Sequence, residues 1–183
     1  MNTPVPEPEL LIRAMAESLM AVLPADPILI GIHTGGAWIA RELHTQLGLA
    51  TPLGSININF YRDDFSRIGL HPQVRASEIP ADIEGQSLIL VDDVLQTGRT
   101  VRAALNEIFS YGRPDTVRLA VMVERDGREL PIQPDIVGTR MTLEPYQHIK
   151  LSGPQQLKLV VAERCRENET TSSSMLKATS GTY

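Results

Sequence analysis

Residues 88–100 of this chain read Leu-Ile-Leu-Val-Asp-Asp-Val-Leu-Gln-Thr-Gly-Arg-Thr. The first four form a continuous apolar run, which is typical of a strand covered on both faces. The Thr-Gly pair is a turn signal, and residues 101–108 then carry apolar side chains at helical spacing. The stretch therefore predicts a buried strand that delivers two aspartates, followed by a tight turn and a helix.

The same alternation of strand and helix signals extends in both directions from this stretch. Apolar residues recur at helical spacing, in short continuous runs, or in strict alternation with polar ones. These patterns predict a helix over residues 11–22, a strand over 28–32, a helix over 39–47 and strands over 56–60, 117–123 and 157–161. Strands that alternate with helices predict an α/β domain built on a largely parallel sheet.

The length and the local composition predict one domain with two irregular segments. The chain has 183 residues, 42% of them hydrophobic, and we expect residues 1–165 to form one globular domain. Residues 62–85 are charged and contain two prolines, and they exceed the ~12–15 residues usual for a structureless connection, which favours a lid or disorder. Residues 166–183 are polar, and we expect a disordered tail there.

Composition excludes several classes of function. The net charge of −5 and the pI of about 5.4 argue against broad nonspecific attraction to nucleic acid, although a local basic face stays open. Cys165 is the only cysteine, so neither an intrachain disulfide nor a multi-cysteine metal site can form. No apolar run reaches the ~20 residues of a membrane span, and the N-terminus lacks the pattern of a secretory signal. We therefore expect a cytoplasmic protein that does not bind membranes.

The turn after the apolar run has the chemistry of a phosphate site. Gly98 leaves room for an oxyanion to approach main-chain amides, and the helix that follows adds unpaired N–H groups and a positive dipole end. Thr97 and Thr100 offer hydroxyl donors. Arg99 is compatible with two placements, over the phosphate or toward solvent. An ordinary surface turn and helix cap is the alternative interpretation.

The aspartate pair suits a different part of the same ligand. Asp92 and Asp93 would repel a phosphate that touched them, but their carboxylates can accept hydrogen bonds from sugar hydroxyls or hold Mg²⁺ and its waters. A sugar phosphate has hydroxyls that suit the aspartate pair and a phosphate that suits the turn. Walker and dinucleotide-binding fingerprints are absent from the sequence, and the four histidines show no zinc-binding spacing.

These thirteen residues resemble the 5-phosphoribosyl-1-pyrophosphate signature of type I phosphoribosyltransferases. Four further segments are similar to the family of bifunctional pyrimidine-operon regulators and uracil phosphoribosyltransferases: residues 60–66, 101–104, 111–114 and 128–132. The resemblance runs in continuous order over about residues 5–160. It implies the type I phosphoribosyltransferase fold, in which a largely parallel sheet flanked by helices carries a small hood and a flexible lid loop.

The resemblance also implies the ligand contacts of the central stretch. Asp92 and Asp93 are expected to address the ribose hydroxyls as catalytic residues and to be the candidate ligands of Mg²⁺. The segment from Gln96 to Thr100 is expected to wrap the 5-phosphate. The implied set for the activated sugar is Asp92, Asp93, Val94, Leu95, Gln96, Thr97, Gly98, Arg99 and Thr100.

The resemblance also implies a role for the glycine loop that follows the predicted strand over residues 28–32. His33, Thr34, Gly35 and Gly36 correspond to a pyrophosphate loop, with a bare glycine turn as the alternative. Many relatives have arginine where this chain has Gly35, and a basic residue where it has His33.

The lid and the hood complete the expected site. Within the lid, Arg62 is expected to be catalytic, and Arg62 and Arg75 are candidates for contact with pyrophosphate, or else solvated charges. Residues 125–135, called the hood segment below, are expected to bind the base through Arg128. Glu129, in the same segment, is compatible with a purely structural role.

The predicted function follows from these assignments. Purine-type relatives often have aspartate where this chain has Gln96, which favours a pyrimidine base. We predict a Mg²⁺-dependent uracil phosphoribosyltransferase that converts uracil and the activated sugar to UMP and pyrophosphate, or a regulator that senses uridine nucleotides, or both. The alternatives are an RNA-binding regulator with little catalysis and a purine salvage enzyme. Expected partners are a pyrimidine messenger leader and further copies of the chain, as a dimer or a larger homo-oligomer.

Overall fold

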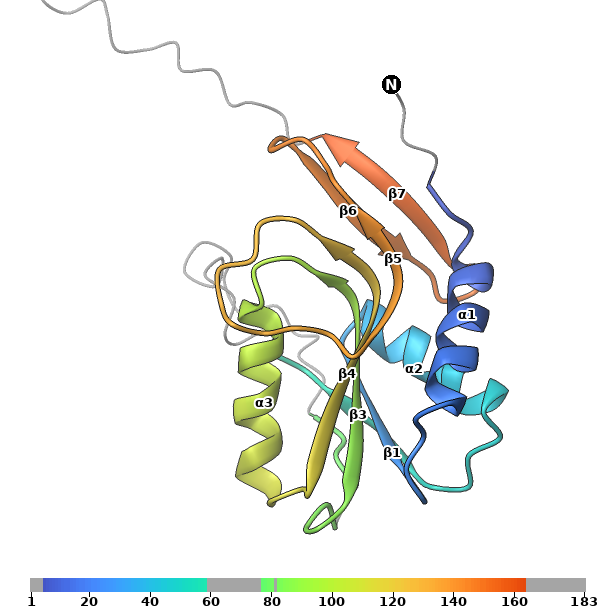
Figure 1. Ribbon diagram of the computed structural model, residues 1–183, viewed down its shortest axis with the longest axis vertical. Coiled ribbons are helices and arrows are strands. Elements are labelled where there is room, and N and C mark those ends of the chain that lie inside the picture. Colours follow the sequence, from blue (N-terminus) through green and yellow to red (C-terminus); the bar gives the residue numbers. More distant parts are fainter. Residues whose placement is uncertain (1–4, 59–76, 81, 164–183) are drawn as a thin grey trace, which may run out of the picture.

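The computed structural model describes residues 5–58, 77–80 and 82–163 of the chain (Figure 1). Its centre is a five-stranded sheet in the order β2-β1-β3-β4-β5, and all four neighbouring pairs are parallel. The elements are α1 (Pro8–Met20), β1 (Ile28–Ile32), α2 (Gly35–Gln46), β2 (Leu53–Ile56), β3 (Ser87–Leu95), α3 (Arg99–Tyr111), β4 (Thr116–Arg125), β5 (Ile136–Met141), β6 (Gln147–Ser152) and β7 (Lys158–Glu163). The predicted α/β class is therefore confirmed.

Helices cover both faces of this sheet. In Figure 1, α1 and α2 lie on one side of the strands and α3 lies on the other. Successive strand residues point to opposite faces, so Leu29 and Ile89 pack under α1 and α2, whereas Ile30 and Leu90 pack under α3. Double coverage explains why the central strands read as continuous apolar runs rather than as alternating ones.

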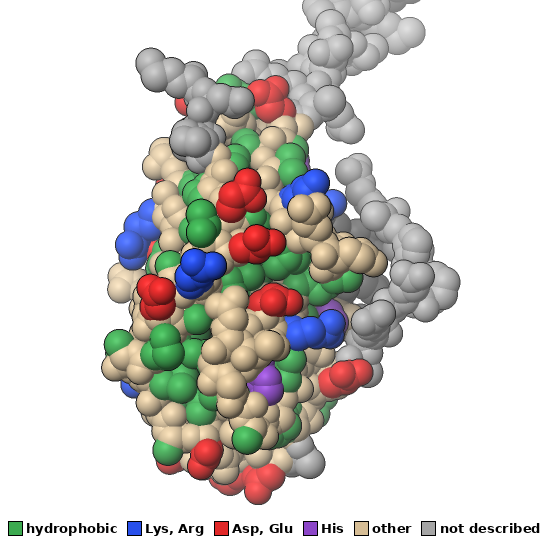
Figure 2. Space-filling model, turned by 90° about the vertical axis from the view of Figure 1, so that its right-hand side faces the viewer, with side chains coloured by type: hydrophobic (Ala, Val, Ile, Leu, Met, Phe, Trp, Pro, Cys, Tyr) green, Lys and Arg blue, Asp and Glu red, His purple; other side chains and the backbone are tan. Residues whose placement is uncertain are grey.

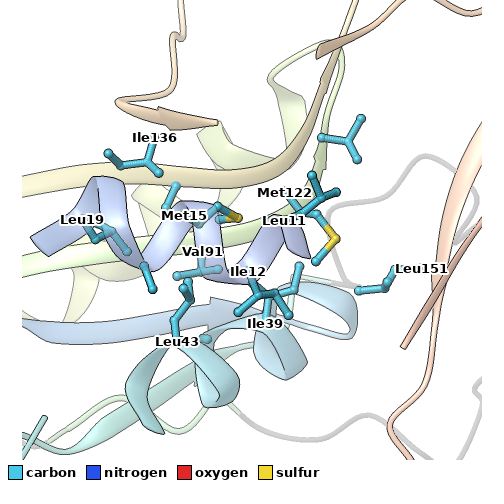
Figure 3. Close-up of a cluster of buried hydrophobic side chains, with 14 of the residues drawn as sticks. Leu11, Ile12, Met15, Leu19, Ile39, Leu43, Val91, Met122, Ile136 and Leu151 are labelled. Carbon is cyan, nitrogen blue, oxygen red and sulfur yellow. The ribbon is translucent and has the colours of Figure 1, made fainter. Parts of the chain in front are cut away.

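The larger of the two cores lies between α1, α2 and the sheet (Figure 3). Apolar side chains repeat along α1 at intervals of three and four residues, and Met15 and Leu19 are fully buried. They meet Ile39 and Leu43 of α2 and Met122 of β4. Burying each such side chain contributes about 1.5–3 kcal/mol to stability, which fixes α2 against the sheet.

A separate antiparallel hairpin of β6 and β7 extends this core beyond the edge of the sheet. Ile149 and Leu151 of β6 and Leu159 of β7 are buried in the same cluster as α1. The buried Arg125, at the end of β4, donates from Nη1 to the carbonyl of Gln147 at 3.0 Å and so connects the hairpin to the sheet.

The strand order places a crevice at one defined point of the sheet. From β1 the chain moves outward to β2, and it then returns to the opposite side of β1 to form β3. Loops that leave the carboxyl ends of β1 and β3 consequently diverge to opposite faces, and open α/β sheets bind ligands at such a switch point. The two glycine loops of the sequence, residues 33–36 and 96–98, both lie there.

Several predicted boundaries differ from the structure. The predicted strand over 88–91 runs on to Leu95, because residues 92, 94 and 95 continue the register with β4. The predicted helix over 11–22 ends at Met20. The strand observed near the predicted strand over 56–60 is Leu53–Ile56; residues 57 and 58 are not part of it, and residues 59 and 60 lie outside the described residues.

Two strands were missed by the sequence patterns, and parts of the chain lie outside the description. The missed strands are β5 and β6. Most of the predicted lid, with Arg62 and Arg75, and the predicted tail lie outside the described residues, as does Cys165. Among the helices of the described part, none has the length and apolar character needed to cross a lipid bilayer.

Candidate active site

The N-terminus of α2 presses directly against the end of β3. A side-chain carbon on Gly36 would overlap the carbonyl oxygen of Val91 and lie only 2.9 Å from the Cα of Asp92. A side-chain carbon on Gly35 would lie 2.6 Å from the carboxylate carbon of Asp93. Only glycine permits this approach, and it brings the predicted pyrophosphate loop beside the aspartate pair.

The pyrophosphate loop itself is anchored to β2. The backbone N–H of His33 donates to the carbonyl of Ile56 at 2.8 Å, and His33 Nε2 lies 3.1 Å from the hydroxyl of Ser55. The His33–Thr34 peptide bond is cis, and the exposed Thr34 immediately precedes α2. A helix of 12 residues begins at Gly35, so its first amides and the positive end of its dipole face the crevice.

The aspartate pair lies within β3, near its carboxyl end, rather than beyond the strand. Asp92 is 3% exposed and its Oδ1 accepts a 3.0 Å hydrogen bond from the N–H of Asp93. Asp93 is half-buried and its Oδ1 accepts a 3.0 Å bond from the N–H of Val94. Both carboxylates are thereby oriented by the backbone of their own strand before any ligand arrives.

An open pocket of about 210 Å³ occupies the turn after these aspartates. It is lined by Asp92, Asp93, Val94, Leu95, Gln96, Thr97, Gly98 and Thr100. These are the residues that the sequence predicts to bind the activated sugar, with the single exception of Arg99, which does not line the pocket. The structure thus brings eight of the nine predicted residues together around one cavity.

The phosphate loop, residues 96–100, forms one end of this pocket. Gly98 has a φ of +90°, a left-handed conformation that other residues adopt only with strain, and α3 begins immediately after it. Thr97 Oγ1 accepts a 3.2 Å bond from the N–H of Arg99, and the first helical hydrogen bond runs from the N–H of Arg102 to the carbonyl of Gly98. Amides of the first turn remain for an anion, as in other helix N-terminal phosphate sites.

The hood segment lies over the phosphate loop. The carbonyl of Thr97 accepts from the N–H of Glu129 at 3.1 Å and from that of Leu130 at 3.0 Å. Arg99 turns away from the pocket, and its Nε and Nη2 each lie 2.8 Å from Glu129 Oε2. Of the two placements that the sequence left open for Arg99, the structure has the one toward solvent: the side chain is 62% exposed, and it forms an ion pair with the hood.

A second pocket, of about 370 Å³, opens where β4 and β5 end. Glu124 is one of its lining residues, with Oε1 2.9 Å from Arg128 Nη2 and Oε2 3.0 Å from Arg140 Nε. Arg128 also donates from Nη1 to the carbonyl of Ile132 at 2.9 Å, which closes the hood segment on itself. Leu95 and Glu124 are register partners in the sheet, so the second pocket adjoins the first.

Sequence reasoning missed Glu124 and Arg140 in this second pocket, whereas Arg125 is the first residue of the predicted hood segment. The buried Arg125 lines it, and its Nε is 4.0 Å from Asp126 Oδ1. The signal that identified the aspartate pair, a charged residue at the carboxyl end of a buried strand, applies equally to Glu124. Arg140 follows a strand that the sequence did not reveal.

A parallel sheet with an acidic, amide-rich pocket at its switch point is the arrangement of the phosphoribosyltransferase class. A family model described as a phosphoribosyl transferase domain matches residues 9–161, and the chain belongs to that family. Within it, the chain belongs with the proteins named bifunctional protein PyrR. One from Pseudomonas syringae pv. syringae is 54% identical over 159 residues, 85% of this chain and 94% of the relative. One from Pseudomonas entomophila is 53% identical over 85% of this chain and 92% of the relative.

Solved structures agree with the fold at low sequence identity. A hypoxanthine-guanine phosphoribosyltransferase from Bacillus anthracis superposes with a TM-score of 0.61 at 16% identity, covering 80% of this chain and 86% of that one. A purine phosphoribosyltransferase from Pyrococcus horikoshii gives 0.57 at 24% identity, covering 81% and 93%. The resemblance drawn from the sequence motifs is therefore confirmed at the level of both fold and family.

Proposed function

We propose that this protein transfers the phosphoribosyl group of 5-phosphoribosyl-1-pyrophosphate to uracil, and that the same site senses uridine nucleotides to regulate pyrimidine genes. The observation that carries the proposal is the 210 Å³ pocket in which paired carboxylates and a glycine-turned helix start face one cavity. The kinship with bifunctional PyrR proteins narrows the class to pyrimidine chemistry.

In this proposal the sugar phosphate lies along the first pocket. Its 5-phosphate accepts hydrogen bonds from the amides and hydroxyls of the phosphate loop, where the dipole of the 13-residue α3 favours negative charge. The ribose hydroxyls donate to Asp92 and Asp93 at the other end. The pyrophosphate lies toward the start of α2, whose amides meet the leaving anion as its charge grows.

The carboxylate pair also fits a Mg²⁺ ion. Mg²⁺ is usually held by one or two carboxylates together with phosphate oxygens, and no cluster of three or more metal-binding side chains exists among the described residues. Asp92 and Asp93 would hold the ion jointly with the substrate. When bound, it would supply charge neutralisation at the leaving pyrophosphate.

The second pocket is the proposed place of the base. A uracil ring presents two carbonyl oxygens and an N–H between them, and the rim of this pocket offers arginine donors beside carboxylate acceptors at Arg128 and Asp126. Uracil N1 attacks C1 of the ribose as the bond from C1 to the pyrophosphate oxygen breaks, and the proton on N1 is released to solvent or to the departing anion. The positive character on the ribose makes a covalent protein nucleophile unnecessary.

A regulatory role is the second part of the proposal. It rests on the PyrR relatives, whose name describes them as bifunctional, and it implies an RNA leader as partner and a cytoplasmic homo-oligomer. Figure 2 shows acidic and basic side chains interspersed on the side of the molecule where α1 lies in Figure 1. The RNA surface is therefore expected on another face.

The experiment that tests the enzymatic part is a panel of bases. Purified protein is incubated with Mg²⁺ and the activated sugar, together with uracil, cytosine, hypoxanthine, guanine or adenine in separate reactions, and pyrophosphate release is measured. Uracil-selective release is the expected result. Release with a purine base alone would replace this proposal by purine salvage, and release with none would leave regulation alone.

The regulatory part is tested by titrating a pyrimidine leader RNA with the protein, in the presence and absence of UMP. Nucleotide-dependent affinity that falls with salt is expected, since phosphate contacts dominate RNA binding. Weak binding that is equal for an unrelated RNA and indifferent to UMP would eliminate specific sensing.

A further inference from the structure

The phosphate loop is joined to the hood segment by backbone and side-chain bonds. The Thr97 carbonyl accepts from the amides of Glu129 and Leu130, and Arg99 pairs with Glu129. The two segments are also close at their glycines, since a side-chain carbon added to Gly98 would lie 3.4 Å from Leu130, and one added to Gly127 would lie 3.4 Å from Gln96. The two segments are about 30 residues apart in the chain, as the separation of Arg99 and Glu129 shows. The loop proposed to receive the phosphate and the segment proposed to receive the base are therefore directly bonded to each other.

Arg99 is the residue that this contact takes out of the pocket. Every residue from Asp92 to Thr100 lines the cavity except Arg99, whose guanidinium is paired with Glu129. A cation in the first turn of a helix opposes the helix dipole. The Glu129 carboxylate offsets that cost and holds the Arg99 side chain on the hood.

We propose that Glu129 is a positioning residue, which acts through Arg99 to lock the hood onto the phosphate loop, so that occupation of the phosphate pocket raises the affinity of the hood for the base. This inference rests on the proposed function. Arg99 and Glu129 are termed the clasp below.

The backbone geometry provides the means of coupling. A phosphate held by the amides that follow Gly98 would fix the orientation of the Thr97–Gly98 peptide. The carbonyl of that peptide, on Thr97, accepts hydrogen bonds from the two hood amides, those of Glu129 and Leu130. Ordering the loop thereby orders the hood, and a second ligand that meets an already ordered segment loses less conformational entropy. The clasp adds a side-chain connection to the backbone one, at positions 62% and 50% exposed.

The test uses Glu129→Gln, Arg99→Gln and the double variant, with Arg102→Gln as the matched control. Arg102 is an exposed arginine one turn further along α3, so its variant removes the same charge from the same helix end. We measure kcat and the KM for uracil at saturating activated sugar, and the dissociation constant of the activated sugar. Because an exposed ion pair supports only modest energies, each single variant should raise the KM for uracil about threefold to fivefold.

The pattern of kinetic effects across the variants distinguishes the clasp from two alternatives: independent roles of Arg99 and Glu129, and direct phosphate binding by Arg99. The double variant should be no worse than either single one, while kcat, affinity for the activated sugar and the Arg102→Gln control stay within about twofold. Additive effects of the two single variants would overturn the proposal. A loss of affinity for the activated sugar in Arg99→Gln alone would instead make Arg99 a phosphate ligand.

A second measurement is independent of the identity of the base. Hydrogen exchange of the Glu129 and Leu130 amides is followed by NMR with and without ribose 5-phosphate. Their exchange should slow on binding in the wild type and in Arg102→Gln, and respond less in both clasp variants. If the base panel fails but this response is present, the proposed function falls and the clasp stands. Exchange that is unchanged by saturating ribose 5-phosphate in the wild type overturns the clasp.

Discussion

The two strand–turn–helix junctions at the switch point look alike in sequence but differ in what their glycines do. At the β1–α2 junction, Thr34 is followed by Gly35 and Gly36, which pack so tightly against β3 that a side chain on either would overlap it. At the β3–α3 junction, Thr97 is followed by Gly98, which has a φ of +90° beside an open pocket of about 210 Å³. The first junction uses glycine for close packing, and the second uses it for backbone conformation.

This difference shows why a Thr-Gly turn between a strand and a helix is an ambiguous pattern. Close approach of a helix to a neighbouring strand and a left-handed turn both require the missing side chain, for separate reasons. Only the neighbours tell them apart: a side-chain carbon on Gly36 meets backbone atoms, whereas one on Gly98 meets Leu130 at an ordinary 3.4 Å. Substitutions at the two junctions should therefore fail in different ways.

The largest effect is expected at the first junction, with Gly36→Ala. The added methyl overlaps the Val91 carbonyl, which is part of a central strand and cannot move aside, so α2 must shift outward. Overpacking of this kind costs typically 1–3 kcal/mol, and we expect about 3 kcal/mol in the free energy of unfolding. Urea denaturation monitored by circular dichroism measures it. A variant as stable as the wild type would show that the helix is not held against β3.

A comparable effect, on binding rather than on stability, is expected for Asp93→Asn. The amide oxygen can keep the hydrogen bond from the Val94 N–H, so stability should change little. Hydrogen bonds to a charged group are worth about 1.5–3 kcal/mol, which predicts about a 10- to 100-fold loss of affinity for the activated sugar by calorimetry. The control is Asp115→Asn, an exposed aspartate just before β4 at the opposite end of the sheet. Equal losses in both variants would remove Asp93 from the site.

A smaller effect is expected for Gly98→Ala at the second junction. The methyl has room, so the cost is the left-handed backbone alone, about 1 kcal/mol in unfolding free energy. Gly48→Ala is the matched control, because Gly48 has a φ of +62° with open space around it, at the end of α2. Both should lose similar stability, and only Gly98→Ala should also weaken binding of ribose 5-phosphate. Unchanged binding would separate the left-handed turn from phosphate recognition.

The smallest effect is expected for Arg140→Gln, which probes the hood anchor behind the second junction. Arg140 pairs with Glu124 but its side chain is 75% exposed, and such pairs contribute about 0–1 kcal/mol. We expect a thermal denaturation midpoint within about 2 °C of the wild type. Arg128→Gln, which removes bonds to both Glu124 and the Ile132 carbonyl, should cost more. The reverse order would place the hood's main anchor at Arg140.

The central strands that the sequence predicted are buried on both faces, and the first predicted helix is buried along one. Residues 28–32 and 88–91 are continuous apolar runs because each lies between two covered faces, and the amphipathic α1 faces a single core. The missed strands are less buried: in β5 only Ile136 and Met141 are buried, and in β6 only Ile149 and Leu151. In a partly buried strand, apolar and polar residues are mixed without a clear period, so the sequence pattern does not distinguish the strand from a loop.

The gathering of residues around the first pocket could be predicted because these residues are local in sequence. A strand, a turn and a helix start within thirteen residues can meet only at one place, and eight of the nine predicted residues line the cavity there. The pairing of Arg99 with Glu129, and of Glu124 with Arg140, had no such local cause. The predicted roles of Arg62 and Arg75 stay predictions, because both lie outside the described residues.

The sequence by itself determined the class of the domain, the position of the Thr97-Gly98 turn between a strand and a helix, and the family. These properties depend on apolar periodicity, on glycine at a turn and on a contiguous motif, all of which act over short distances along the chain. Tertiary structure alone decided that Gly35 and Gly36 make contact with β3 and that Arg99 faces the hood. Both depend on which strand neighbours β1 and on how the hood segment folds back, and such long-range choices follow from the packing of the whole sheet.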